Sequence, residues 1–192
     1  AFARKDLPIV YIFNQNFEFT TPSLNPEYLV FSSPQGSSEK VPLLIYLHGA
    51  GGVGDQIEKI KGQAMSVWKG LQKFNKGTCI VVAPQCLKRW VVQDLNLFLQ
   101  NLKANFPIDS RRIYLTGNSM GGYGTWAWAA HSPEHFAAIA PVVGGIGPKG
   151  PKDVTPDLAK WAAKLTTVPV YAFAGAKDKV VPAERSERMI LA

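Results

Sequence analysis

The sequence predicts an α/β fold built around a mostly parallel central sheet, and three observations lead to this prediction. Continuous apolar runs such as VPLLIYL and TCIVVAP are typical of parallel strands that are buried on both faces. Segments with helical periodicity separate these runs, as in successive β-α-β units. The 192 residues, 46% of them hydrophobic, suffice for one compact domain, which we expect to span residues 1–192.

The strands are expected in two groups. The first group comprises two strands at 9–17 and 27–33, because the breaker-rich stretch TTPSLNP separates two β-prone runs. The second group comprises buried strands, which are expected at 41–47, 78–84, 112–117, 137–143 and 168–175.

Helices are expected between the buried strands. Residues 90–106 carry apolar side chains at steps of three and four, which places them on one helical face. Residues 122–131 are apolar nearly all round, as in a helix buried at the centre of a domain. The segment 155–165 begins with Thr155 as a predicted N-cap and Pro156 at the first helical position. The final residues, AERSERMILA, resemble the start of one more helix.

The charge pattern argues against several classes of partner. The net charge is +7, but the basic residues are spread over many segments, which indicates a solvated basic surface; mild attraction to anionic substrates or surfaces is the alternative. No basic run alternates with aromatics, so we expect no nucleic-acid partner. No apolar run has the length of a membrane-spanning helix, so we expect no membrane partner.

Cysteines and histidines predict neither a disulfide nor a metal site. In an extended strand, Cys79 and Cys86 would lie about 23 Å apart, which is too far for a disulfide. A bend after Pro84 would be needed to bring them together. Three dispersed histidines and two separated cysteines form no ligand cluster, so we expect no metal and no cofactor.

The stretch LTGNSMGG contains the pattern G-x-S-x-G, centred on Ser119, between a predicted strand and a predicted helix. In this context the pattern is typical of a nucleophile held on a sharp, strained turn. Gly117 and Gly121 would be required there because side chains at these positions would collide. A glycine-rich turn that merely ends the strand is the alternative.

Two further motifs follow buried strands. His48 to Gly52, HGAGG, is a glycine-rich loop whose Ala50 or Gly51 amide could join that of Met120 in an oxyanion hole. A phosphate-binding loop is the alternative, but the lysine and the spacing of known phosphate motifs are lacking.

The second motif, GAKDKVVP, places Asp178 59 residues after Ser119. This order suits an acid that follows its nucleophile along the chain; a solvated turn residue is the alternative.

These motifs together resemble the serine esterases of the α/β-hydrolase superfamily, in the phospholipase/carboxylesterase and feruloyl-esterase-like group. The resemblance rests on LIYLHGAGG, VAPQC…W, DSRRIYLTGNSMGGYGTW and GAKDKVVP, and runs from about Glu27 onward. It implies a three-layer fold with Ser119 as nucleophile and Asp178 as acid. It also implies that Gln85 and Trp90 line the substrate pocket.

The catalytic histidine that the resemblance implies does not follow Asp178, so we expect a fold that lacks its last helix and strand. His131 lies twelve residues past Ser119, about 18 Å along a helix, and His135 lies further away. His48 belongs to the glycine-rich loop and is a weak substitute. The base would come from a longer form of the protein or from another chain, or else the chain is a non-catalytic variant.

The resulting hypothesis is a cofactor-independent esterase that forms an acyl-enzyme on a small-molecule or glycan-linked ester. A serine peptidase and a non-catalytic binding module on the same fold are the alternatives. An exposed sheet edge would also allow a homodimer.

Overall fold

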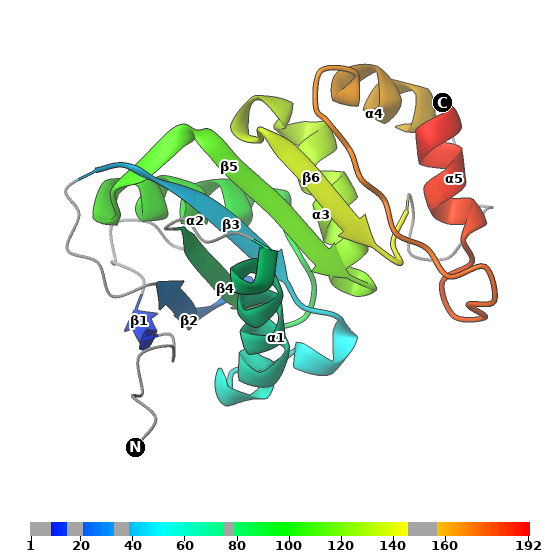
Figure 1. Cartoon of the computed structure of the whole chain (residues 1–192). Coiled ribbons are helices and arrows are strands. Elements are labelled where there is room, and N and C mark those ends of the chain that lie inside the picture. Colours follow the sequence, from blue (N-terminus) through cyan, green and yellow to red (C-terminus); the bar gives the residue numbers. More distant parts are fainter. Residues whose placement is uncertain (1–8, 15–20, 33–38, 75–78, 146–156) are drawn as a thin grey trace.

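A six-stranded sheet forms the centre of the computed structural model, which describes residues 9–14, 21–32, 39–74, 79–145 and 157–192 (Figure 1). The strand order is β1-β2-β4-β3-β5-β6. The first two strands are antiparallel to each other, and β2 is antiparallel to β4, whereas the remaining four strands are mutually parallel. The strands are β1 (Ile9–Asn14), β2 (Leu24–Ser32), β3 (Val41–Leu47), β4 (Ile80–Cys86), β5 (Ile108–Asn118) and β6 (Ala138–Val142).

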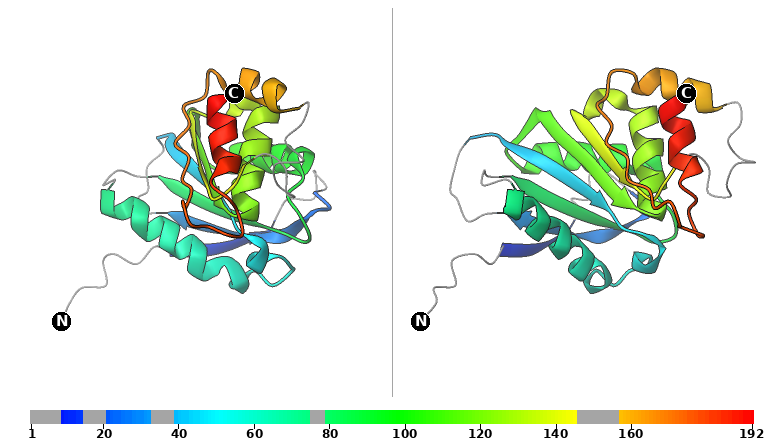
Figure 2. Two further views of the ribbon diagram at one scale, coloured as in Figure 1. Left: turned by 90° about the vertical axis from the view of Figure 1, so that its right-hand side faces the viewer. Right: turned by 45° about the vertical axis from the view of Figure 1, so that its right-hand side comes forward.

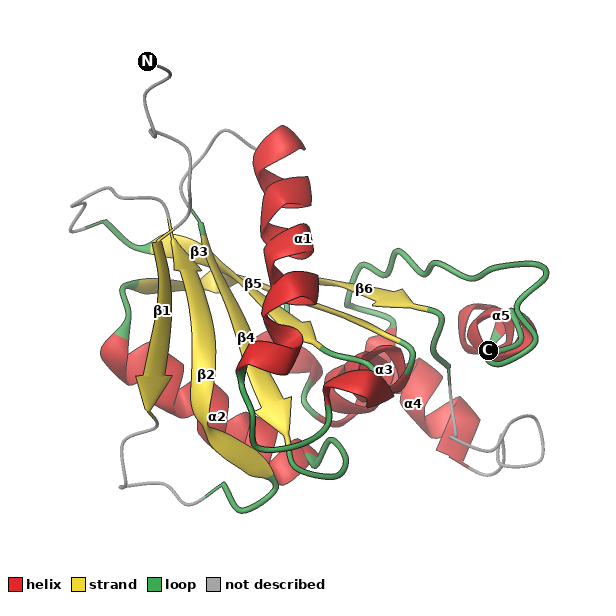
Figure 3. Ribbon diagram, turned by 90° about the horizontal axis from the view of Figure 1, so that it is seen from below, coloured by secondary structure: helices red, strands yellow, loops and turns green. Residues whose placement is uncertain are grey.

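Helices cover both faces of this sheet, which gives three layers (Figures 2 and 3). The helix α1 packs on one face, and α2 and α3 pack on the other. The helices α4 and α5 lie beyond β6, at the end of the sheet opposite β1. The helices are α1 (Glu58–Phe74), α2 (Val92–Asn105), α3 (Met120–His131), α4 (Asp157–Leu165) and α5 (Glu184–Leu191), with short 3-10 turns at Ala50–Gly52 and Pro133–His135.

Two apolar clusters correspond to the two faces of the sheet. The larger cluster joins the sheet to α2 and α3 and includes Phe98, Trp126 and Trp128. The smaller cluster joins the other face to α1 through Ile60 and Trp68. Burial of both faces explains the continuous apolar strand sequences and confirms the predicted mostly parallel sheet.

The helix α1 was not among the predicted helices. Its buried side chains Ile60, Ala64 and Trp68 recur at steps of four, so the signal was present in the sequence. The helices expected at 90–106 and 122–131 are confirmed as α2 and α3. The predicted cap at Thr155 and Pro156 lies outside the described residues.

The strand expected at 168–175 is reduced to two bridges, Ile139–Val170 and Val142–Phe173. Backbone bonds on either side of the gap are intact, including Ile139 N to Pro169 O at 2.9 Å and Val143 N to Phe173 O at 2.7 Å. The bond between them is lacking because Pro141 has no N–H to donate. The segment still runs parallel to β6 and delivers the following loop to the carboxyl ends of the strands.

Candidate active site

Ser119 occupies the turn between β5 and α3 in a strained backbone conformation, with φ of 54° and ψ of −117°. Few residues other than glycine adopt a positive φ, and such strain is concentrated at functional sites. The turn is held by Ser119 N, which donates to Val142 O at 3.0 Å, and by Tyr123 N, which donates to Ser119 O at 3.0 Å. The predicted strained strand-to-helix turn is therefore confirmed.

The two glycines that flank Ser119 are required by close backbone contacts. A Cβ at Gly121 would lie 1.9 Å from Leu47 O, and a Cβ at Gly117 would lie 2.5 Å from Gly121 O. Both distances are far inside van der Waals contact. The turn can therefore fold down onto the end of β3 only if both residues lack a side chain.

The glycine-rich loop after β3 lies directly against this turn. A Cβ at Gly49 would be 3.1 Å from Asn118 Nδ2 and 3.5 Å from Ser119 Cβ. Ala50 and Gly51 are exposed at the start of the 3-10 turn, and Met120 starts α3. The first amides of a helix have no acceptor within it, so the amides of all three residues are suited to bind an anion. The structure thus brings the predicted oxyanion residues to the turn that carries Ser119, the predicted nucleophile.

His48 is fully buried and both of its ring nitrogens are engaged. Its Nδ1 lies 2.7 Å from Gly49 O, and its Nε2 lies 3.1 Å from Cys86 N. The ring therefore donates from Nδ1 and accepts at Nε2, which fixes the neutral tautomer. Burial lowers the pKa of His48 despite the opposing hydrogen bond to Gly49. These contacts make His48 a structural link between the ends of β3 and β4.

This burial predicts a pH-dependent stability. In the unfolded chain His48 binds a proton with an ordinary pKa near 6.5, whereas the folded site resists protonation. The folded state is therefore fully stabilised above about pH 6.5 and loses up to about 2 kcal/mol as the pH falls to about 5. The pKa of His135 is lowered in the same direction, also by burial. The free energy of unfolding, measured with urea at about pH 6.5 and about pH 5, should fall less with pH in His48→Gln than in wild type and as much as in wild type in His131→Gln. A wild-type fall in His48→Gln would refute the assignment.

The two residues expected to line a substrate pocket have different surroundings. Gln85 is fully buried; its Oε1 accepts from Asn25 at 2.7 Å, and its Nε2 donates to Gly52 O at 2.7 Å. It therefore holds the end of the glycine-rich loop from beneath and has no exposed surface. Trp90 is half-buried, packs on His48 with ring centroids 4.7 Å apart, and donates to His48 O at 3.3 Å.

Asp178 lies on the loop that follows the segment parallel to β6. Its Oδ1 accepts from Val180 N at 2.8 Å and from Val181 N at 2.9 Å. These backbone bonds lower the pKa of the carboxyl, the bond from Val181 having the largest effect. Phe173 is level with Val142, which is paired with Asn118, so the Asp178 loop and Ser119 lie at the same edge of the sheet.

Neither of the two remaining histidines lies at that edge. His131 ends α3, where its Nδ1 lies 2.8 Å from Ala127 O and its ring packs against Trp161. His135 ends the next 3-10 turn, beside Glu134. Among the described contacts, no histidine bonds to Ser119 or Asp178.

The sequence analysis missed two polar side chains that contact the Ser119 turn or the first turn of α3. Tyr46 reaches Asn118 from β3, and Arg185 reaches the Tyr123 hydroxyl from α5. Tyr46 carried a detectable signal, because a tyrosine in a doubly buried strand needs a partner for its hydroxyl. Arg185 carried none, since it depends on how α5 docks against α3.

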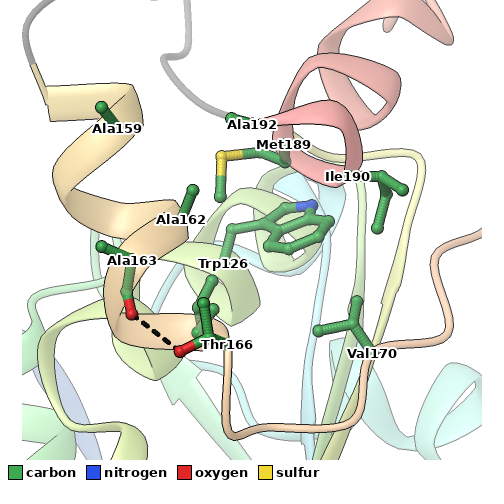
Figure 4. A pocket seen from close by; sticks show the side chains of 10 residues that line it. Trp126, Ala159, Ala162, Ala163, Thr166, Val170, Met189, Ile190 and Ala192 are labelled. Atoms are coloured by element: carbon green, nitrogen blue, oxygen red, sulfur yellow. Dashed lines mark hydrogen bonds between the residues drawn. The ribbon is translucent and has the colours of Figure 1, made fainter.

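Other features of the chain are separate from this edge. An apolar pocket of about 280 Å³ lies between α3, α4 and α5, lined by Trp126, Val170 and Met189 among others (Figure 4). Its lining contains none of the candidate site residues. Cys79 and Cys86 are free, as predicted, and burial raises their pKa values to about 11 and about 12.

The described part of the chain contains neither a metal-binding cluster nor a membrane-spanning helix. No group of three or more His, Cys, Asp or Glu side chains there is arranged to hold a metal ion. Likewise, none of its helices combines the length and the apolar character needed to cross a bilayer.

Comparisons with known proteins agree on the fold. The Prolyl oligopeptidase family matches residues 83–149. Probable feruloyl esterase C of Aspergillus terreus is 26% identical over 133 residues, covering 65% of this chain and 48% of that protein. Poly(3-hydroxyalkanoate) depolymerase C of Paucimonas lemoignei is 31% identical over 131 residues, covering 58% of this chain and 30% of that protein. The chain thus spans about half or less of the length of these relatives.

A solved structure extends the similarity over nearly the whole chain. The crystal structure of a thermostable esterase is 27% identical and has a TM-score of 0.74, covering 96% of this chain and 50% of that one. Together with the sheet order and the strained Ser119 turn, these similarities show that the chain has the α/β-hydrolase fold and support its place in the group that contains the esterases of that superfamily.

Proposed function

We propose that this chain is part of a serine-dependent carboxylic-ester hydrolase that works through an acyl-enzyme. The observation that carries the proposal is the strained Ser119, held between two glycines that cannot bear side chains. Such strain costs stability and is retained where it presents a reacting group. The relatives named Probable feruloyl esterase C and Poly(3-hydroxyalkanoate) depolymerase C support an ester substrate. Our proposal is that this ester is a small molecule or is linked to a glycan.

The proposed reaction assigns each step to a group of the protein. Ser119 Oγ attacks the ester carbonyl and transfers its proton to a histidine. The amide of Met120 and that of Ala50 or Gly51 donate to the resulting oxyanion. The histidine then gives the proton to the departing alcohol as the C–O bond breaks, and water hydrolyses the acyl-enzyme by the same route.

The histidine of this scheme is proposed to come from outside these 192 residues. His48 has no free nitrogen, His131 ends α3 at the opposite end from Ser119, and His135 lies beyond that end. Asp178 is suited to orient an incoming imidazole, because its carboxylate is held ionised by two backbone amides at the edge where Ser119 lies.

A Ser119→Ala variant tests the nucleophile. We expect a longer form of the protein that carries the missing histidine to be labelled by a fluorophosphonate at Ser119, and its Ser119→Ala variant to show no labelling, because only an activated serine reacts quickly. Mass spectrometry of the labelled peptide locates the adduct. Labelling that persists in Ser119→Ala would place the nucleophile elsewhere, and an unlabelled longer form with Ser119 intact would favour a non-catalytic binding module.

A serine peptidase is the second candidate, favoured by the match of the Prolyl oligopeptidase family over residues 83–149. Amide hydrolysis would use the same serine, acid and oxyanion amides. Parallel assays on p-nitrophenyl esters and peptide p-nitroanilides separate the two functions. We expect the esters to be preferred, and preferential cleavage of the anilides would favour the peptidase.

A further inference from the structure

Three polar side chains form a row between the surface of α1 and the nucleophile turn. The Tyr46 hydroxyl lies 2.9 Å from Oε1 of Gln63, which is on α1, and 2.6 Å from Oδ1 of Asn118, which directly precedes Ser119. Gln63 is exposed, whereas Tyr46 is only 5% exposed. A buried hydroxyl therefore connects the helix surface to the turn that carries the nucleophile.

The two distances assign the proton of this hydroxyl. A tyrosine hydroxyl has one proton, so it can donate to only one of its two neighbours. The 2.6 Å contact is within the range for O–H···O bonds but shorter than N–H···O bonds usually are, so Tyr46 donates to Asn118. We therefore assign the Gln63 amide the reverse orientation, with Nε2 donating to the Tyr46 oxygen, because a half-turn of an amide exchanges its oxygen and nitrogen. Burial raises the pKa of Tyr46 to about 12, which keeps the hydroxyl protonated.

This arrangement fixes which end of the Asn118 amide faces the glycine-rich loop. With Oδ1 bound to Tyr46, Nδ2 points at Gly49 and would lie 3.1 Å from a Cβ at that position. Gly49 is followed by Ala50 and Gly51, whose amides are the proposed oxyanion donors.

We propose that Tyr46 and Asn118 are positioning residues that hold the glycine-rich loop at its working distance from Ser119. The proposal rests on the proposed ester hydrolysis for its catalytic meaning. Gln63 is not one of the two positioning residues, but the strength of its side chain as a hydrogen-bond acceptor decides whether the Tyr46 hydroxyl donates to Asn118.

A matched pair of Gln63 variants tests the direction of the proton. In Gln63→Glu a carboxylate replaces the amide, and a charged acceptor attracts the Tyr46 proton away from Asn118. In Gln63→Met the neighbour can no longer accept or donate, so the bond from Tyr46 to Asn118 remains. Both substitutions are at an exposed position on α1, so both variants should fold like wild type.

The first measurement is the rate at which a fluorophosphonate modifies Ser119 when the missing base is supplied, either by the longer form or by added imidazole. We expect Gln63→Glu and Tyr46→Phe to slow the maximal rate about three- to tenfold, as loss of one hydrogen bond would. Gln63→Met should stay within about twofold of wild type. The probe concentration for half-maximal rate should not change, because neither residue is proposed to bind the probe.

The second measurement follows the loop without any chemistry at Ser119. The amides of Gly52 and Val53 bond to Gly49 O at 3.0 Å and Ala50 O at 3.2 Å, so their hydrogen exchange reports the order of the loop. NMR should show faster exchange at both in Gln63→Glu and Tyr46→Phe, unchanged exchange in Gln63→Met, and unchanged exchange in α2 throughout.

Equal behaviour of the two Gln63 variants, or unchanged loop exchange in Tyr46→Phe, would overturn the positioning role. Uniformly faster exchange across α2 as well would also overturn it, because Tyr46 would then support the whole fold equally. If Ser119 of the wild type never reacts, the proposed function fails, while the exchange measurement still decides the positioning role.

Discussion

Replacing Gly121 by alanine should lower the free energy of unfolding by at least about 3 kcal/mol and remove the reactivity of Ser119. The new Cβ would lie 1.9 Å from Leu47 O and 2.8 Å from His48 O, both backbone atoms. Neither atom can move without shifting the end of β3, which also begins the glycine-rich loop. The strain would therefore appear both as lost stability and as a displaced nucleophile turn.

Gly70→Ala provides the matched control. Gly70 lies in α1, and a Cβ there would meet nothing within 4 Å. Alanine should stabilise the helix by about 0.5–1 kcal/mol, because glycine is the weaker helix former. Urea unfolding of the two variants gives both free energies. A Gly121→Ala protein as stable and as reactive as Gly70→Ala would contradict the close contact with β3.

Supplying a histidine beside Asp178 should raise ester hydrolysis about 10³-fold or more over the 192-residue chain. A triad without its base retains only the contributions of binding and of the oxyanion hole, and no histidine in this chain has a free nitrogen near Ser119. The direct test compares p-nitrophenyl acetate hydrolysis by this chain and by a longer form that carries a histidine after α5. Free imidazole, added to the 192-residue chain, should restore part of the rate.

Ser119→Ala is the control in each arm, since the gain in rate must depend on the nucleophile. The opposite result would be ordinary enzymatic turnover by the 192-residue chain alone, abolished by Ser119→Ala. A base within the chain would then exist, and His48 would be the first residue to replace, because it belongs to the glycine-rich loop that lies against the Ser119 turn.

The sequence was informative about the site wherever the site is a local motif. The pattern around Ser119 predicts a strained turn because only glycines at 117 and 121 permit it, and the backbone angles agree. The loop at 48–52 was recognisable because a glycine-rich stretch directly follows a buried strand. The Tyr46–Asn118 contact spans 72 residues of sequence, so no local pattern predicts it.

The environment of single side chains was the hardest to predict. Gln85 was expected to line a pocket. In the structure it is buried and links Asn25 to Gly52, at the end of the glycine-rich loop, through hydrogen bonds of its side-chain amide. Its role follows from the pairing of β2 with β4, which the sequence does not specify. In the same way, the engagement of both His48 nitrogens depends on the register of β3 against β4.

By itself, the sequence determined the fold class, the succession of most strands and helices along the chain, and the strained turn at Ser119. These properties depend on apolar periodicity and on backbone sterics, which act over a few residues. Only the tertiary structure decided that β1 and β2 join the sheet beside β4, that Pro141 interrupts the pairing of the segment before Asp178, and that His48 is sealed in the core. Hydrogen bonding and burial between distant segments are settled when the strands pack, so they appear only in three dimensions.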